Sequence, residues 1–299
     1  MREDPVDGPL DLRRTLRFML MWGASSWLKI DDSGAWYARR TADGPATICI
    51  RHKGDRLVTA GWGPGAVALL ADVPMLAGLG NRGVADVTPT TDRVRDLRIK
   101  MIGTRQARSG QVFPQLVSVA LGQKVTGVNG KRSLWNIARR WGERAPGPRD
   151  DLILLPTPRE LERRPYYEYS RLGIERKRAD LVRRIASRAT ALQRAASMSF
   201  ADGRAHLEKL PGIGPWTSGI IMGGVLGDAD AVPIGDYHLP NFISWTLAKE
   251  PRATDARMME LLEPYAGQRG LVVRMIKSSG NAPPKWGPRM SVQDMRDLS

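Results

Sequence analysis

The chain has 299 residues, a formal net charge of +15 at pH 7, 42% hydrophobic residues and 26% charged residues. This composition is typical of a soluble globular protein with room for two domains, and no apolar run reaches the roughly 20 residues of a membrane-spanning helix. The only cysteine, Cys49, excludes an internal disulfide framework and any zinc site or iron–sulfur cluster that needs four cysteines. The N-terminal sequence MREDPVDGPLDL is too acidic for a signal peptide, so we expect a cytoplasmic protein.

The excess of basic residues has two interpretations. A strongly basic chain commonly has a polyanionic partner such as nucleic acid. The alternative is an arginine-rich protein from a GC-rich genome. Composition alone does not separate these alternatives.

Residues 1–98 show a mixed pattern. Apolar residues recur at helical spacing over residues 10–23. Three short β-rich runs follow within residues 35–62, broken by Gly-Pro and Gly-Asp turns. A further helix is predicted over residues 63–80. The order of helix, strands and helix predicts a small N-terminal α+β domain.

From Leu97 onward the pattern is almost entirely helical. An apolar helix is predicted over residues 111–122, and residues 175–197 place apolar side chains on one stripe and arginines on the other. We interpret that arginine face as solvated. The pattern predicts a helical domain over residues 99–280, followed by a Pro-rich, irregular tail over residues 281–299.

The segment at residues 207–246 reads as two helices joined by a tight hairpin. The first helix ends at Leu210, and Gly212 and Gly214 suit a turn that reaches positive φ and lets another backbone approach closely. Pro215 suits the first turn of the second helix, where its missing N–H is not needed. The unpaired N–H groups at that helix start then face outward, where a phosphate can bind.

The loop PIGDYHLP at residues 233–240 carries Asp236 just before another helix-like run. Taken alone, an aspartate at this place is more often a helix cap. A carboxylate at a helix N-terminus is also favoured in its ionised form, which suits a catalytic role. The loop by itself leaves both interpretations open.

These motifs together resemble the helix-hairpin-helix–Gly/Pro–Asp superfamily of DNA glycosylases, and within it the alkylbase branch, DNA-3-methyladenine glycosylase II. The hairpin LPGIGPWT and the loop with Asp236 carry the resemblance, together with the runs LVSVALGQKVTG, LGIERKRADLVRRIA and ARMMELLEPYAGQRG. It covers most of residues 100–275. The resemblance implies a mostly α fold, a helix-hairpin-helix glycosylase bundle with a small N-terminal α+β domain.

The resemblance also implies the chemistry. Asp236 would stabilise the oxocarbenium-like transition state formed when the bond between C1′ and a flipped-out base breaks. Bifunctional members of the superfamily carry a nucleophilic lysine where this chain has Trp216, which cannot form a Schiff base. We therefore expect a monofunctional enzyme of base excision repair that releases alkylated purines such as 3-methyladenine and 7-methylguanine and leaves an abasic site.

The DNA contacts implied by the resemblance fall into two groups. Phosphate contacts come from the hairpin residues Gly212, Ile213, Gly214 and Thr217. A side chain that fills the gap left by the flipped base comes from Gln123, Lys124 or Val125, with the choice among the three left open. A monovalent cation held by hairpin carbonyls is also implied, but no required cofactor and no metal site of side chains. The expected partner is double-stranded DNA containing damaged bases, bound by a monomer that associates with no membrane and, in a bacterium, with the nucleoid.

The base pocket departs from the family pattern. Trp216 keeps one aromatic ring, but Ile220 stands where the relatives have a tyrosine. The register gives Arg274 or Met275 where a pocket tryptophan is expected, and Tyr237 is a candidate substitute. Two alternatives therefore stay open: a glycosylase for another lesion, such as a bulky or deaminated base, and a non-catalytic helix-hairpin-helix DNA-binding protein.

Overall fold

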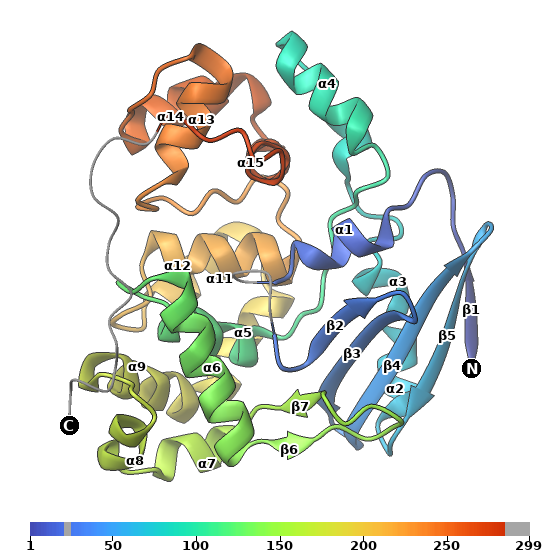
Figure 1. The fold of residues 1–299 in the computed structure, drawn as a ribbon, viewed down its shortest axis with the longest axis vertical. Helices are drawn as coiled ribbons and strands as arrows, with labels where there is room; N and C mark the ends of the chain where they lie inside the picture. The colour runs from blue at the N-terminus through green and yellow to red at the C-terminus, as the bar shows by residue number, and fades with distance from the viewer. Residues whose placement is uncertain (21–24, 285–299) are drawn as a thin grey trace.

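The computed structural model describes residues 1–20 and 25–284 (Figure 1). Its N-terminal part contains a five-stranded antiparallel sheet with the strand order β1-β5-β4-β3-β2. The strands are β1 (Arg2–Pro5), β2 (Leu28–Asp31), β3 (Gly34–Thr41), β4 (Gly44–Lys53) and β5 (Arg56–Trp62). The helices of this part are α1 (Leu12–Arg17), α2 (Ala66–Ala71), α3 (Val73–Leu76) and α4 (Asp92–Lys100).

The two faces of the sheet pack against different parts of the chain because successive side chains point to opposite faces. Ala46, Ile48 and Ile50 of β4 lie in the main core. Trp36 and Cys49 point the other way and pack against the short hairpin formed by β6 (Glu143–Arg144) and β7 (Ile153–Leu154). The sheet is thus buried on both sides.

The three β-rich runs expected from the sequence are β3, β4 and β5. Strands β1 and β2 were not expected, because their short charged sequences become strands only by pairing with β5 and β3. The predicted helix over residues 10–23 is shorter in the structure, where α1 ends at Arg17 and residues 21–24 lie outside the described residues. The helix predicted over residues 63–80 is divided into α2 and α3.

In the rest of the described chain, up to residue 284, the regular elements are helices apart from β6 and β7, a hairpin that the periodicity did not predict. The helices are α5 (Val112–Leu121), α6 (Gly127–Trp141), α7 (Pro158–Arg163), α8 (Tyr166–Arg171), α9 (Arg176–Ser187), α10 (Ala189–Gln193), α11 (Phe200–Glu208), α12 (Pro215–Ile221), α13 (Leu239–Ala248), α14 (Asp255–Leu262) and α15 (Arg269–Ser278). The prediction of a mostly α fold with a small N-terminal α+β part is confirmed. Within the described residues, no helix combines the length and apolarity needed to cross a bilayer.

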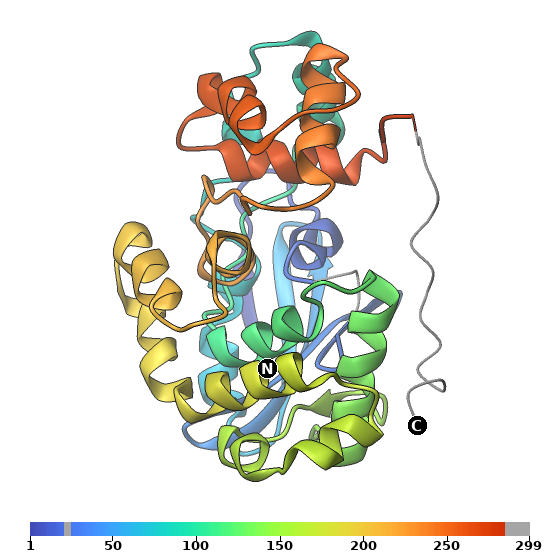
Figure 2. The ribbon, with the colours of Figure 1, turned by 90° about the vertical axis from the view of Figure 1, so that its left-hand side faces the viewer.

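The structure has two large hydrophobic cores. The main core joins one face of the sheet to α5, α6, α9 and α12. The second core joins α4 to α13, α14 and α15, and these helices lie together at the top of Figure 1 and of the rotated view in Figure 2. The predicted boundary after residue 98 falls inside α4, so the division into 1–98, 99–280 and 281–299 stays a prediction. Residues 285–299 of the predicted tail lie outside the described residues.

Candidate active site

The hairpin between α11 and α12 lies against α9. Gly212 has φ +101°, so the turn requires glycine, and a Cβ at this position would lie 2.8 Å from Cδ1 of Leu181 on α9. Ile213 is 3% exposed and anchors the turn in the main core. Gly214 precedes Pro215, the first residue of α12. The two helices and the tight turn predicted from the sequence are present.

Gln123 connects the turn after α5 to this hairpin. Its side-chain amide donates to the Gly212 carbonyl at 2.9 Å and to the Thr217 hydroxyl at 3.0 Å. Thr217 is only 2% exposed, so its side chain lies beneath the hairpin. Of the three candidate wedge residues, Lys124 is the exposed one, whereas Gln123 and Val125 are partly buried. Lys124 also has φ 57°, a left-handed conformation that is strained for a residue other than glycine.

The loop with Asp236 is brought to α12 by a close backbone contact. A Cβ at Gly219 would lie 2.7 Å from both the Pro233 Cα and the Val232 carbonyl oxygen, so only glycine allows the loop to approach so closely. As a result, the Trp216 indole N–H donates to Oδ2 of Asp236 at 3.1 Å. The hairpin and the acid, separated in sequence, meet at this hydrogen bond.

The other carboxylate oxygen of Asp236 caps α13. Oδ1 accepts hydrogen bonds from the backbone N–H groups of His238 and Leu239, both at 2.9 Å. The capping interpretation is therefore confirmed for Oδ1. Oδ2 accepts from Trp216 instead, and the catalytic role of Asp236 stays a prediction. An amide at this position could preserve the cap but would lack the charge.

The surroundings of Asp236 favour its ionised form. Burial is the largest single influence and raises the pKa of Asp236, but Lys277, the Trp216 N–H and the backbone N–H groups of His238 and Leu239 all lower it. Their combined effect holds the pKa of Asp236 below its ordinary value. The carboxylate is therefore charged at neutral pH.

Asp236 lines a cavity of about 220 Å³ at the junction of the two cores. Trp216 and Ile220 of α12 form part of one wall, and Arg274 and Lys277 of α15 form part of another. Phe18 and Gln115 also line it. The cavity thus combines an ionised carboxylate, an aromatic ring and two cationic side chains.

The predicted pocket residues have different places in the structure. Trp216 and Ile220 line the cavity together with Asp236. Tyr237 is 88% exposed, packs edge-on against His238 and is not among the residues that line the cavity. Asp236 caps the start of α13, and Tyr237, the next residue, is exposed to solvent.

The wall from α15 was largely missed from the sequence. Of the two residues that the register offered, Arg274 lines the cavity and Met275 is completely buried in the second core. Lys277 was not considered, although Gly270, Val273, Arg274 and Lys277 recur at the spacing of one helix face. Two cations on such a face are a signal that sequence reasoning could have used.

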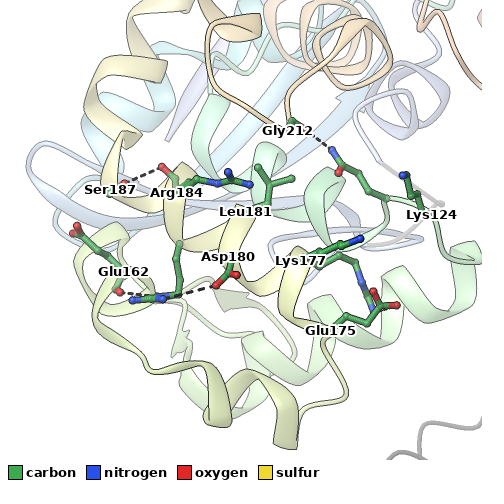
Figure 3. A pocket seen from close by; sticks show the side chains of 12 residues that line it. Lys124, Glu162, Glu175, Lys177, Asp180, Leu181, Arg184, Ser187 and Gly212 are labelled. Atoms are coloured by element: carbon green, nitrogen blue, oxygen red, sulfur yellow. Dashed lines mark hydrogen bonds and ion pairs between the residues drawn. The ribbon is translucent and has the colours of Figure 1, made fainter.

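A larger, open groove of about 690 Å³ lies beside the hairpin along α9 (Figure 3). Its basic side chains include Lys124, Lys177 and Arg184, and Gly212 forms its border with the hairpin. Glu162, Glu175 and Asp180 also line it, so its charge is mixed. Asp236 does not line this groove. Among the residues that the structure describes, no cluster of three or more His, Cys, Asp or Glu side chains could hold a metal ion.

Most of the chain shares its fold with solved DNA glycosylases. It is similar to the 3-methyladenine DNA glycosylase from Archaeoglobus fulgidus, with a TM-score of 0.77 and 15% identity over 94% of this chain and 99% of that chain. It is similar to MBOgg1, solved with a low-affinity DNA ligand, with a TM-score of 0.71 and 16% identity over 94% of this chain and 100% of that one. The 8-oxoguanine glycosylase/lyase from Clostridium acetobutylicum, bound to double-stranded DNA, gives a TM-score of 0.67 and 15% identity over 89% of this chain and 92% of that one.

No protein-family model matches the chain, and no curated protein sequence matches it either. At identities of 15–16%, the structural likeness shows the fold alone. It confirms the predicted helix-hairpin-helix glycosylase bundle. Because 3-methyladenine and 8-oxoguanine glycosylases both share this fold, the likeness does not distinguish the alkylbase branch from the other branches.

Proposed function

We propose that this protein is a monofunctional DNA glycosylase that removes a damaged base from double-stranded DNA and leaves an abasic site for base excision repair. The observation that carries the proposal is the ionised Asp236 carboxylate in a cavity, hydrogen-bonded to Trp216 directly after the hairpin. An enzyme that acts on a base inside a duplex must rotate the nucleotide into such a cavity.

Asp236 acts on the sugar in this mechanism. As the bond between C1′ and the base nitrogen lengthens, positive charge develops on C1′ and the ring oxygen, and a fixed carboxylate stabilises it. The hydrogen bonds from Trp216, His238 and Leu239 hold the carboxylate in place before the reaction begins. Water then adds to C1′, and Asp236 orients that water.

The monofunctional assignment rests on Trp216. The indole occupies the position after the hairpin and bonds to the carboxylate, where a bifunctional member would have an amine. Lys277 is an amine that lines the cavity, so the assignment can be tested directly. We expect no covalent complex with DNA after borohydride treatment. A trapped complex that disappears in Lys277→Gln would contradict the assignment.

DNA binding is proposed to use the hairpin and the turn after α5. Gly212, Ile213 and Gly214 would contact a phosphate through the backbone. Lys124 is exposed at the tip of the turn, so we assign the wedge role to its long side chain, whose methylene groups can enter the base stack. Gln123 instead holds the turn on the hairpin.

A monovalent cation at the hairpin is also proposed. The carbonyls of Leu210 and Gly212 accept hydrogen bonds from Ile213 and Gln123, and each oxygen has a second lone pair that suits a hard cation. The residues present therefore fit such an ion. It would strengthen phosphate binding, and no step of the reaction uses it.

The excised base has two candidate classes. The sequence resemblance favours alkylated purines such as 3-methyladenine and 7-methylguanine, with Trp216 as the ring against which a cationic base would stack. A glycosylase for another lesion is favoured by one observation, the presence of Arg274 and Lys277 in the cavity.

The proposal is tested by base release. Wild type and Asp236→Asn are incubated with methylated genomic DNA and with duplexes that carry single deaminated or oxidised bases, and the released bases are identified by chromatography. Release by wild type and its loss in Asp236→Asn would support the proposal. If wild type releases no base from any substrate, and if a duplex with an abasic-site mimic binds no more tightly than undamaged duplex, the protein is a non-catalytic DNA-binding protein.

A further inference from the structure

The cavity has an unusual charge for a site that is expected to receive a cationic base. Among the described residues that line it, the charged ones are Asp236, Arg274 and Lys277. Lys277 is exposed and its charge acts on Asp236, whose pKa it lowers. One carboxylate and two basic side chains give the cavity a net positive charge, and Arg274 is the less exposed of the two basic residues.

Arg274 is fixed in position by its neighbours. Its Nη1 donates to Oε1 of Gln106, and Gln106 is 2% exposed and donates to the Gly223 carbonyl at 2.6 Å. Gly223 also makes room for the guanidinium, because a Cβ there would clash with Nη2 of Arg274. On its other side, Cζ of Arg274 lies 5.6 Å from the ring centroid of Phe18. The guanidinium is therefore a preorganised group at the cavity wall.

Arg274 keeps its charge in this environment. Burial lowers the pKa of Arg274 to about 10, although the negative charge of Asp228 opposes this effect. The group is therefore still protonated at neutral pH. Asp228 is not among the residues that line the cavity, so it acts on the charge of Arg274 without itself contacting a ligand in the cavity.

A fixed cation has opposite effects on the two classes of base. 3-Methyladenine and 7-methylguanine are positively charged while attached to the sugar, and they leave as neutral molecules. A guanidinium beside them destabilises the bound state and has no developing negative charge to stabilise. An uncharged base leaves with the electron pair of the broken bond, and a fixed donor stabilises the resulting negative charge most strongly in the transition state.

We propose that Arg274 contacts the flipped base and that the substrate is an uncharged base bearing an exocyclic carbonyl, of the kind produced by deamination or oxidation. This proposal rests on the proposed glycosylase function. A forked guanidinium is well suited to donate to a carbonyl oxygen and an adjacent ring nitrogen of such a base.

The proposed reaction breaks one bond at C1′ and forms another. The bond between C1′ and the base nitrogen breaks, and its electron pair departs with the base, where Arg274 stabilises it. Asp236 stabilises the positive charge that develops on the sugar, and the oxygen of a water molecule then forms a bond to C1′. The proton lost by that water ends on the departed base, so the products are the free neutral base and the abasic sugar.

The test compares single-turnover release from two groups of otherwise identical duplexes. One group contains deoxyinosine, 8-oxodeoxyguanosine or deoxyuridine, and the other contains 7-methyldeoxyguanosine, which is cationic. Arg274→Met removes the charge at similar length, Arg274→Lys keeps the charge but loses the fork, and Arg95→Met changes an exposed arginine of α4 that does not line the cavity. The ratio of the two rates within one preparation is the readout, because misfolding lowers both rates and leaves the ratio unchanged.

We expect wild type to release at least one of the uncharged bases faster than 7-methylguanine. Arg274→Met should lower that uncharged-base rate by about 100-fold, the usual effect of removing one donor to a developing anion, and leave the 7-methylguanine rate equal or higher. Arg274→Lys should release the uncharged base at a rate between those of wild type and Arg274→Met. Arg95→Met should release both bases at the wild-type rates. Release of 7-methylguanine alone, or an unchanged ratio in Arg274→Met, would overturn the inference while the glycosylase proposal stands. No release from any duplex would contradict the glycosylase proposal itself and this inference with it.

Discussion

The two walls of the cavity differ in origin and in proposed task. One wall, here called the hairpin wall, holds Trp216 of α12 and Asp236 of the loop before α13, and we propose that it acts on the sugar. The other wall comes from α15 and holds Arg274 and Lys277. The first wall would break the bond whatever base is attached, and the second would determine which base is accepted. One fold can therefore serve several lesions if the hairpin wall is kept and the α15 wall changes.

The largest effect is expected at the hairpin wall, from Asp236→Asn. The amide oxygen can still accept the two backbone N–H groups that start α13, so the helix cap is kept. The charge is lost, and so is the hydrogen bond that Oδ2 accepts from Trp216, because an amide NH2 cannot accept it. We expect base release to fall by roughly 10²- to 10³-fold, the size seen when one group that stabilises transition-state charge is removed. Single-turnover kinetics measure this change, and thermal unfolding should show a melting temperature close to that of wild type.

Lys124→Gly should change activity and stability in opposite directions. Glycine relieves the left-handed conformation at φ 57°, so the free energy of unfolding should rise by about 1 kcal/mol in urea titrations. The loss of the wedge should slow base release about 10- to 100-fold, because unstacking a base costs a few kcal/mol that the wedge partly offsets. Lys124→Met is the matched control: it keeps a long side chain and should retain most of the activity. A fully active Lys124→Gly would assign the wedge elsewhere.

Trp216→Phe keeps an aromatic ring but removes the hydrogen bond to Asp236. The bond lowers the pKa of Asp236, so its loss should raise that pKa toward the ordinary value near 3.9. Activity requires the ionised form and is lost as the pH falls through this pKa, so the acid limb of the pH–rate profile should move to higher pH. The rate at neutral pH should fall about 10-fold, which corresponds to the lower end of the contribution of hydrogen bonds to charged groups. An unmoved acid limb would show that the Trp216 N–H does not tune the carboxylate.

The smallest effect is expected in the groove along α9, which belongs to neither wall. Lys177 and Arg184 line it next to the hairpin, and replacing both with glutamine should weaken binding equally for damaged and undamaged duplex. For every ion pair with a phosphate that the substitutions remove, the slope of log K against log salt concentration should become shallower by about 0.9. Fluorescence anisotropy over a salt series measures the slope. An unchanged slope would show that these side chains do not contact phosphates and belong to a solvated face, as predicted from the sequence.

The two walls also differ in how many of their residues could be predicted from the sequence. The hairpin follows from local signals, since Gly212, Gly214 and Pro215 each require a particular backbone within a few residues. The place of Asp236 beside Trp216 depends on one close backbone contact, at Gly219. These residues could be predicted because their positions are set largely by the segment itself.

The α15 wall depends on contacts between distant segments. A Cβ at Gly270 would lie 2.7 Å from the Ala231 carbonyl oxygen, so α15 packs directly on the loop that leads to Asp236, and this packing turns Arg274 and Lys277 into the cavity. No local pattern reports such a contact. The same limit explains the missed strands β1 and β2, which form by pairing with β5 and β3, and the exposure of Tyr237, which follows from the cap that Asp236 makes.

The division of tasks between the walls is tested most directly by measuring single-turnover release of one uncharged base and of 7-methylguanine by wild type, Asp236→Asn and Arg274→Met. We expect Asp236→Asn to lower both rates by a similar factor and Arg274→Met to lower only the uncharged-base rate. If both variants lower both rates in the same proportion, the two walls do not have separate tasks and Arg274 does not select the base.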